Sequence, residues 1–250
     1  MKPRVYAFAN QKGGVGKTTT AINLAACLAE AGERALVVDL DPQANATSGL
    51  GMRANGTSSY DLLDGAPLED LVKPTAFDNL FLVPSKPELA GAAVELSRRD
   101  DGDRYLAQAL EDADGYDFVL LDCPPSLGPL TVNALAAADR VIVPVQTEYY
   151  ALEGLAQLMQ SINLIKSRLN PRLEIAGVLL TMADGRTRLS AEVEAEVRRH
   201  FGGLVFTAVV PRSVRVAEAP SHGLPVTHYD RRSRGAEAYW KVAMELVERR

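Results

Sequence analysis

Short apolar runs recur along the chain, and longer amphipathic stretches separate them. The runs do not alternate apolar with polar residues, which is typical of strands covered on both faces of a mostly parallel sheet. They predict strands at residues 5–9, 35–38, 80–83, 118–121, 141–145, 175–180 and 204–210. The longer stretches repeat apolar residues at spacings of three and four, which predicts helices at residues 18–31, 152–169, 190–201 and 234–248.

This order of elements predicts an α/β fold, a doubly wound and mostly parallel sheet with helices on both faces. The chain has 250 residues and shows no internal repeat, low-complexity tract or Pro/Ser-rich linker, so we expect one domain over residues 1–250. Ligands on such sheets bind at the carboxyl ends of the strands. The loops expected to carry function therefore follow Asn10, Asp39, Asp122, Thr181 and Val210.

Composition places the chain among ordinary globular proteins, with 47 % hydrophobic and 24 % charged residues. A first strand at Val5 leaves no room for a signal peptide, and no apolar run is long enough to span a bilayer. The two cysteines, Cys27 and Cys123, show neither metal-ligand spacing nor a disulfide framework. We expect a reduced, cytoplasmic protein.

The charge of the chain is unevenly distributed. The net charge of −5 argues against attraction to nucleic acid over the whole surface. However, residues 186–234 carry nine Arg against five acidic residues, whereas residues 1–185 carry 15 Lys+Arg against 24 Asp+Glu. A local basic face is compatible with nucleic-acid binding, and a solvated charged surface is the alternative.

The sequence QKGGVGKT follows the first expected strand and precedes the first expected helix, which is the context of a phosphate-binding loop. Its three glycines allow backbone N–H groups to turn toward phosphate oxygens, and the helix adds its positive dipole end. Lys17 would contact the β- and γ-phosphates, and the Thr18 hydroxyl would be a ligand of Mg²⁺. A glycine-rich turn without a ligand is the alternative.

The loop departs from the general motif G-x-x-x-x-G-K-[ST], because Gln11 stands at the first position and Lys12 at the second. This KGGVGKT form resembles the deviant Walker A motif of the ParA/MinD family of P-loop ATPases. The resemblance implies an ATP-dependent sandwich homodimer, in which Lys12 reaches the phosphates held by the other subunit. A cation of this kind acts like an arginine finger, which raises rates by roughly 10³–10⁵. The alternative is a Lys12 that is solvent-exposed or binds the phosphates of its own subunit.

Two more expected strands end in acidic residues. ALVVDLDPQ provides Asp39 and Asp41, and FVLLDCPPS provides Asp122. An apolar strand that ends in Asp sets a carboxylate beside Mg²⁺, directly or through water. The resemblance gives Asp122 the Walker B role in the magnesium's second shell, and makes Asp41 the residue that orients the attacking water while Asp39 supports the loop.

The sequence VVPRSVRVAEAPSHGLPV at residues 209–226 resembles the adenine loop of ParA-type proteins, with Ser213 where Asn is usual. The resemblance places Pro211, Arg212 and Ser213 against the adenine and Met182 on its other side. The expected sites are then as follows: Lys12, Lys17 and Asp41 for catalysis; Lys12, Gly13, Gly14, Val15, Gly16, Lys17, Thr18, Thr19, Met182, Pro211, Arg212 and Ser213 for the nucleotide; Thr18, Asp41 and Asp122 for the metal.

The same resemblance assigns Arg186 and Arg215 to a DNA-facing surface built across the dimer. Nearby arginines that would widen it are Arg188, Arg231, Arg232 and Arg234. Arginines that neutralise phosphates without reading bases give non-specific, salt-sensitive binding. For each single arginine, a surface ion pair is the alternative.

Two further stretches, residues 42–51 and 144–155, are similar to the chromosomal ParA/Soj branch. The second is expected near the dimer interface, and the alternative for its Tyr149, Tyr150 and Leu152 is a plain core role. Related reductases hold an iron–sulfur cluster between subunits, but Cys27 falls inside a helix where no such ligand belongs. We expect Cys123 to be buried and inert.

The resemblance runs from about Val5 to Ala243 and implies a DNA-partitioning ATPase for chromosomes or plasmids. Its cofactors are ATP and Mg²⁺, and its partners are a second copy, double-stranded DNA bound without sequence preference, and a ParB-type centromere-binding protein that stimulates a low basal hydrolysis. We expect a location on the nucleoid and no membrane partner. The alternatives are a MinD-like positioning ATPase with a lipid-binding C-terminal helix, a metabolic ligase or kinase, and a non-hydrolysing scaffold. Acidic residues in that helix disfavour anionic lipid.

Overall fold

The computed structural model describes residues 2–53, 55–148 and 151–249. Within these residues, seven strands form one sheet in the order β3-β4-β2-β5-β1-β6-β7, and neighbouring strands are parallel except for β3 and β4. The strands are β1 Arg4–Phe8, β2 Ala35–Asp39, β3 Lys73–Pro74, β4 Leu80–Val83, β5 Phe118–Asp122, β6 Arg140–Gln146 and β7 Glu174–Thr181.

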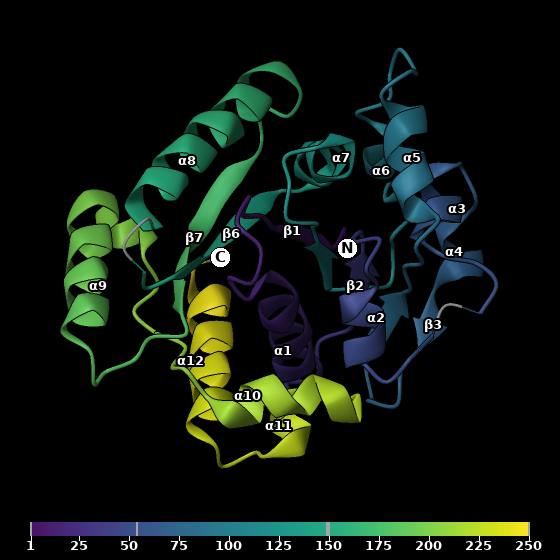
Figure 1. The fold of residues 1–250 in the computed structure, drawn as a ribbon. Helices are drawn as coiled ribbons and strands as arrows, with labels where there is room; N and C mark the ends of the chain where they lie inside the picture. Colours follow the sequence, from purple (N-terminus) through teal and green to yellow (C-terminus); the bar gives the residue numbers. More distant parts are fainter. Residues whose placement is uncertain (1, 54, 149–150, 250) are drawn as a thin grey trace.

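The helices connect these strands and cover both faces of the sheet (Figure 1). They are α1 Lys17–Glu30, α2 Asn45–Gly49, α3 Ser59–Leu63, α4 Leu68–Leu71, α5 Leu89–Leu96, α6 Tyr105–Ala109, α7 Pro129–Ala137, α8 Ala151–Arg168, α9 Arg188–Phe201, α10 Val214–Glu218, α11 Val226–Tyr229 and α12 Arg234–Glu248. Two short 3₁₀ turns are η1 Gly202–Leu204 and η2 Ala219–His222. The doubly wound, mostly parallel α/β fold predicted from the sequence is confirmed.

Alternate residues of the central strands face two separate cores. In β1, Tyr6 and Phe8 pack with apolar residues of α1 and α12, whereas Val5 and Ala7 pack with those of α7 and α8. In Figure 1, α1 and α12 lie on one side of the sheet and α7 and α8 on the other. Both faces of each central strand are therefore buried, which explains why the apolar runs do not alternate.

The register of the central strands brings the predicted acidic residues to one edge. Asp39 at the end of β2 lies opposite Asp122 at the end of β5, and Asp122 lies opposite Phe8 at the end of β1. Because these strands are parallel, the loop after β1 and the loops after β2 and β5 leave the sheet at the same edge. The order and direction of the strands therefore bring the phosphate-binding loop after β1 next to the two loops that carry acidic residues.

The strand predicted at residues 204–210 is not formed. The backbone of the segment pairs with β7 and the residues just after it only at isolated bridges near its two ends. Between them, the N–H groups of Thr207 and Ala208 donate to the Glu245 carboxylate, and Arg198 donates to the carbonyl oxygens of Phe206 and Thr207. Side chains from α9 and α12 thus take the backbone groups that a strand would have given to its neighbour.

The C-terminal helix α12 packs against α1. Val242 and Leu246 are fully buried, Trp240 is partly buried against the same core, and Met244 is exposed. This confirms the expectation that α12 is an amphipathic helix that closes the sheet. No helix in the described part of the chain is long and apolar enough to cross a bilayer.

Candidate nucleotide-binding site

The phosphate-binding loop lies between β1 and α1, and glycines set its shape. Gly14 and Gly16 have φ of 74° and 89°, in the left-handed region that favours glycine, and Gly16 is the N-cap residue of α1. The Thr181 hydroxyl at the end of β7 donates to the Val15 carbonyl oxygen over 2.8 Å. The loop is therefore tied to β7 just before α1, where the first N–H groups of the helix lack partners within it.

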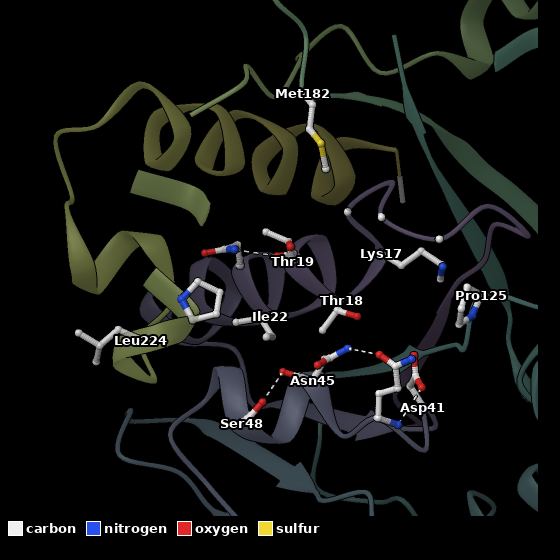
Figure 2. A pocket seen from close by; sticks show the side chains of 16 residues that line it. Lys17, Thr18, Thr19, Ile22, Asp41, Asn45, Ser48, Pro125, Met182 and Leu224 are labelled. Carbon is white, nitrogen blue, oxygen red and sulfur yellow. Dashed lines mark hydrogen bonds between the residues drawn. The ribbon is translucent and has the colours of Figure 1, made fainter. Parts of the chain in front are cut away.

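A pocket of about 430 Å³ opens along this loop and the flank of α1 (Figure 2). Lys17, Asp41 and Pro125 lie at one end of it, whereas Leu224 lies at the other, beyond Ile22. The predicted residues that line it are Gly13, Gly14, Gly16, Lys17, Thr18, Thr19, Asp41 and Met182. Thus the phosphate loop and the acidic loop after β2 face a common space.

Lys17 is almost completely buried, with 6 % of its surface exposed. Its ammonium donates to the Lys12 carbonyl oxygen over 3.4 Å. Burial lowers the pKa of Lys17, and the nearby carboxylates of Asp122 and Asp41 act in the opposite direction. A buried cation at the base of an open pocket is suited to an anion with several oxygens.

Asp122 is fully buried, and neither of its carboxylate oxygens has a hydrogen-bond partner in the described chain. Burial raises its pKa well above the ordinary range, and Asp39 adds to this effect while the charge of Lys17 opposes it. A buried carboxylate without a partner is costly, and such groups usually have a ligand or an ordered water. Asp122 therefore fits a carboxylate that binds a hydrated cation held beside Thr18.

The described residues contain no group of three or more His, Cys, Asp or Glu side chains arranged to hold a metal ion. Mg²⁺ does not need such a group, because it keeps several waters and binds through one or two protein oxygens together with substrate phosphates. The Thr18 hydroxyl and the unpartnered carboxylate of Asp122 provide donors of this kind. The predicted magnesium site therefore fits the residues present.

Asp39 and Asp41 have different environments at the end of β2. Asp39 is fully buried and accepts hydrogen bonds from the Thr47 N–H over 2.8 Å, the Thr47 hydroxyl over 2.7 Å and the Asp41 N–H over 3.1 Å. Burial raises the pKa of Asp39 to about 6, and these hydrogen bonds oppose the effect. Asp41 instead lines the pocket, and its carboxylate accepts the Gln43 N–H over 2.9 Å. Asp39 thus shapes the loop, whereas Asp41 faces the ligand space.

A second pocket of about 340 Å³ adjoins the first, and Gly16, Thr19 and Met182 line both. Its walls include Pro211, Arg212 and Ser213, so the structure brings together the four residues predicted to contact adenine. Most of its other lining is apolar, which suits the face of a nucleobase. The Ser213 hydroxyl accepts the Val216 N–H over 3.5 Å and thereby caps α10.

Two predicted nucleotide contacts do not line either pocket. Val15 has a buried side chain, so any contact it makes with a ligand is through its backbone. Lys12 lies outside the pocket on the exposed rim, where its ammonium forms an ion pair with Glu148. Within one protomer, Lys12 therefore does not face the phosphate space of its own subunit.

The predicted DNA-facing arginines lie on the surface and form ion pairs there. Arg186 makes two contacts with Asp184, over 2.9 and 2.8 Å, and its side chain is 86 % exposed. Arg215 lies between Glu218 and Asp230, at 3.2 and 3.3 Å. Of the residues expected to widen this surface, Arg188 pairs with Glu192 and Arg231 with Glu30. Part of the positive charge counted from the sequence is thus neutralised locally.

Several pocket residues had no role in the sequence prediction. They are Ile22, Asn23, Gln43, Asn45, Ser48, Pro220 and Leu224 in the first pocket, and Tyr239 with Val216 and Ala217 in the second. For Gln43, Asn45 and Ser48, the sequence offers one signal, the similarity of residues 42–51 to a known family. The α12 residue Tyr239 had no such signal, because only the fold brings α12 to the pocket.

Cys123 is fully buried, and burial raises the pKa of its thiol, as it does for Cys27. Both thiols are therefore held in the protonated, unreactive form. Leu152 is partly buried against the core around α8, which agrees with the core alternative. Tyr149 and Tyr150 lie outside the described residues.

Comparison with known proteins gives consistent matches. The family model described as an AAA domain matches residues 3–175. The chromosome-partitioning ATPase Soj of Thermus thermophilus is 57 % identical over 248 residues, covering 99 % of this chain and 97 % of the relative. The chromosome partitioning protein ParA of Caulobacter vibrioides is 52 % identical, covering 98 % and 94 %.

Solved structures are similar over almost the whole chain. Cobyrinic acid a,c-diamide synthase from Mycobacterium smegmatis, solved with bound ATP analog and magnesium, has a TM-score of 0.87 at 37 % identity and covers 98 % of this chain and 95 % of that one. The septum site-determining protein MinD of Pyrococcus horikoshii, complexed with Mg-ADP, has a TM-score of 0.81 at 27 % identity and covers 97 % and 95 %.

Proposed function

Since the chain belongs to the Soj/ParA family of chromosome-partitioning ATPases, we propose that it hydrolyses ATP with Mg²⁺ in a sandwich homodimer that binds DNA and releases it after hydrolysis. The observation that carries the proposal is the placement of its two loop lysines. Lys17 is buried at the base of the pocket, whereas Lys12 lies exposed on the rim and outside its own pocket. These positions support a role of Lys17 toward the phosphates of its own subunit and a role of Lys12 toward a second subunit.

The binding step uses groups that are already in position. The N–H groups at the start of α1 and the Lys17 ammonium would hold the β- and γ-phosphates, because both offer positive charge at the base of the pocket. Met182, Pro211 and Ser213 would enclose the adenine in the adjoining pocket. When bound, Mg²⁺ would neutralise charge on the β- and γ-oxygens, with Thr18 as its ligand and Asp122 holding one of its waters.

Hydrolysis requires a water in line with the γ-phosphate, and in this proposal Asp41 would orient it. Asp41 lies on the pocket wall on the same side as Lys17, and the Gln43 N–H fixes one of its oxygens. The partner subunit's copy of Lys12 would then stabilise the charge that develops on the phosphate. Without a second subunit this cation would be missing, so we expect a low basal rate.

DNA would bind through Arg186 and Arg215 on the paired subunits, since these side chains are exposed. Binding would have no sequence preference if their guanidinium groups neutralise phosphates and contact no base edges. A ParB-type centromere-binding protein would stimulate turnover and release the dimer from the nucleoid. A MinD-like membrane role is less well supported, because Val242 and Leu246 of α12 are buried against the core and Met244 is its one large hydrophobic residue that is prominently exposed among the described residues.

The proposal is tested by sedimentation velocity and duplex-DNA binding with a non-hydrolysable ATP analogue and Mg²⁺. We expect the wild-type protein to sediment as a dimer and to retain DNA only when the analogue is present. Lys17→Ala should lose nucleotide binding, whereas Lys12→Ala should bind nucleotide and lose stimulated turnover. A wild-type protein that stays monomeric with the analogue, and that binds DNA equally well without it, would contradict the proposal.

A further inference from the structure

The exposed rim of the phosphate-binding loop carries an ion pair that the nucleotide site does not use. The Lys12 ammonium donates to the carboxylate of Glu148, which lies two residues after the end of β6. The two residues are 136 positions apart in the sequence, and about half of each side chain is exposed. Lys12 therefore has a partner within its own subunit before any second subunit arrives.

The backbones on both sides of this pair are held together. The Asn10 side chain accepts the Lys12 N–H over 3.0 Å and donates to the Pro144 carbonyl oxygen over 2.7 Å, so it links the loop to β6. On the other side, the Glu148 N–H donates to the Gln146 carbonyl oxygen over 2.8 Å. Because the backbones are already ordered, forming the ion pair requires only the side chains to be fixed.

We propose that Glu148 is a positioning residue that holds Lys12 within its own subunit and thereby opposes ATP-dependent pairing of two subunits. The inference rests on the proposed role of Lys12 across the dimer. The Lys12 ammonium cannot lie over the partner's triphosphate and keep its contact with Glu148 without bringing that carboxylate against the phosphate charge. The ion pair must therefore break before Lys12 completes the neighbouring site, and Glu148 sets a threshold for dimerisation.

The size of this threshold follows from the exposure of the pair. Exposed ion pairs change an equilibrium by about 1.4- to 5-fold, because water and salt screen them. A symmetric dimer breaks two such pairs, so their effects multiply. Glu148→Gln should therefore lower the dissociation constant of the nucleotide-bound dimer by about 2- to 30-fold.

The first measurement is sedimentation velocity over a concentration series, with a non-hydrolysable ATP analogue and Mg²⁺. The variants are Glu148→Gln and, as a matched control, Glu111→Gln, which removes the same charge from an exposed position after α6, outside residues 144–155. We expect tighter dimerisation for Glu148→Gln, no change for Glu111→Gln, and the same nucleotide affinity of the monomer in both, because neither residue lines a nucleotide pocket.

The second measurement reads the ion pair directly in the nucleotide-free protein. An amine-reactive acylating reagent labels lysines, and mass spectrometry follows the rate at Lys12, with Lys241 as an internal reference. Release from Glu148 should raise the Lys12 labelling rate about 1.4- to 5-fold in Glu148→Gln. A role of Glu148 in fold stability alone would not change Lys12 relative to Lys241.

The outcomes separate this inference from the proposed function. If the wild-type protein dimerises with the analogue but Glu148→Gln dimerises equally or more weakly, or if Lys12 labelling is unchanged, the role of Glu148 is refuted and the proposed function is not. If neither protein dimerises at any concentration, the proposed function fails and this inference fails with it.

Discussion

The two glycines that flank α1 provide a controlled test of the phosphate-binding loop. Gly16 caps the N-terminus of the helix and Gly32 follows its C-terminus, with φ of 89° and 94°. A Cβ added at Gly16 would meet Met182 and Thr181 at 3.8 Å, and one added at Gly32 would meet nothing within 4 Å. Alanine therefore fits sterically at both positions. In both variants the strain comes from the same source, an alanine held at positive φ.

The expected loss of stability is similar for Gly16→Ala and Gly32→Ala. An alanine in the left-handed region costs about 1–2 kcal/mol. For a chain of this size, each kcal/mol lowers Tm by about 2–4 °C, so both variants should melt about 2–8 °C below the wild type. The two substitutions should differ in their effect on the affinity for ATP. A shift of the loop that loses one charge-assisted hydrogen bond costs about 1.5–3 kcal/mol, or about ten- to hundredfold in affinity.

The assay combines thermal unfolding of the nucleotide-free protein with calorimetric titration of ATP and Mg²⁺. Gly16→Ala should lose both stability and affinity, whereas Gly32→Ala should lose stability alone. Equal affinity of Gly16→Ala and the wild type, or an equal loss of affinity in both variants, would refute the assignment of this loop to the phosphates.

The remaining predictions concern the acidic loop and the basic surface. Because burial raises the pKa of Asp39 to about 6, its charge destabilises the fold above that pH, and this destabilisation is lost as the pH falls from 7 to 4. In denaturant titrations across this range, the unfolding free energy of the wild type should rise by about 3 kcal/mol toward low pH, and Asp39→Asn should lack this rise. Unfolding free energies that depend on pH in the same way in both proteins would contradict the prediction. Arg215→Ala should weaken duplex binding equally for all sequences and reduce the salt slope by about one, while Arg199→Ala, at the far end of α9, should not; gel-shift titrations at several salt concentrations decide this.

The parts of the site that the sequence predicts are those fixed by local geometry and strand order. The loop from Gly13 to Thr18 carries its own conformational signals, and its position between a strand and a helix follows from the adjacent pattern. Asp41 and Asp122 could be placed beside it because parallel strands present their carboxyl ends at one edge. The direction of the strands alone brings these carboxylates to the loop.

The parts that the sequence does not predict depend on contacts between distant side chains. Apolar periodicity marks residues 204–210 as a strand, but Arg198 and Glu245 occupy its backbone groups from two other helices. The contact between Lys12 and Glu148 has no local signal, because a charged residue in a loop can face solvent or any neighbour. For the same reason, the sequence does not predict the ion pairs of Arg186 and Arg215.

The sharing of sites between two subunits is tested most directly by mixing two inactive variants. Asp41→Ala should bind ATP and still carries Lys12 but lacks the carboxylate that orients the attacking water, whereas Lys12→Ala binds ATP and lacks the cation for its partner. With DNA and a ParB-type partner present, each variant alone should show background turnover. An equal mixture should recover up to about a quarter of the wild-type rate, because half of its dimers are mixed and each mixed dimer has one complete site. No recovery at any mixing ratio, or wild-type turnover by Lys12→Ala alone, would contradict the account.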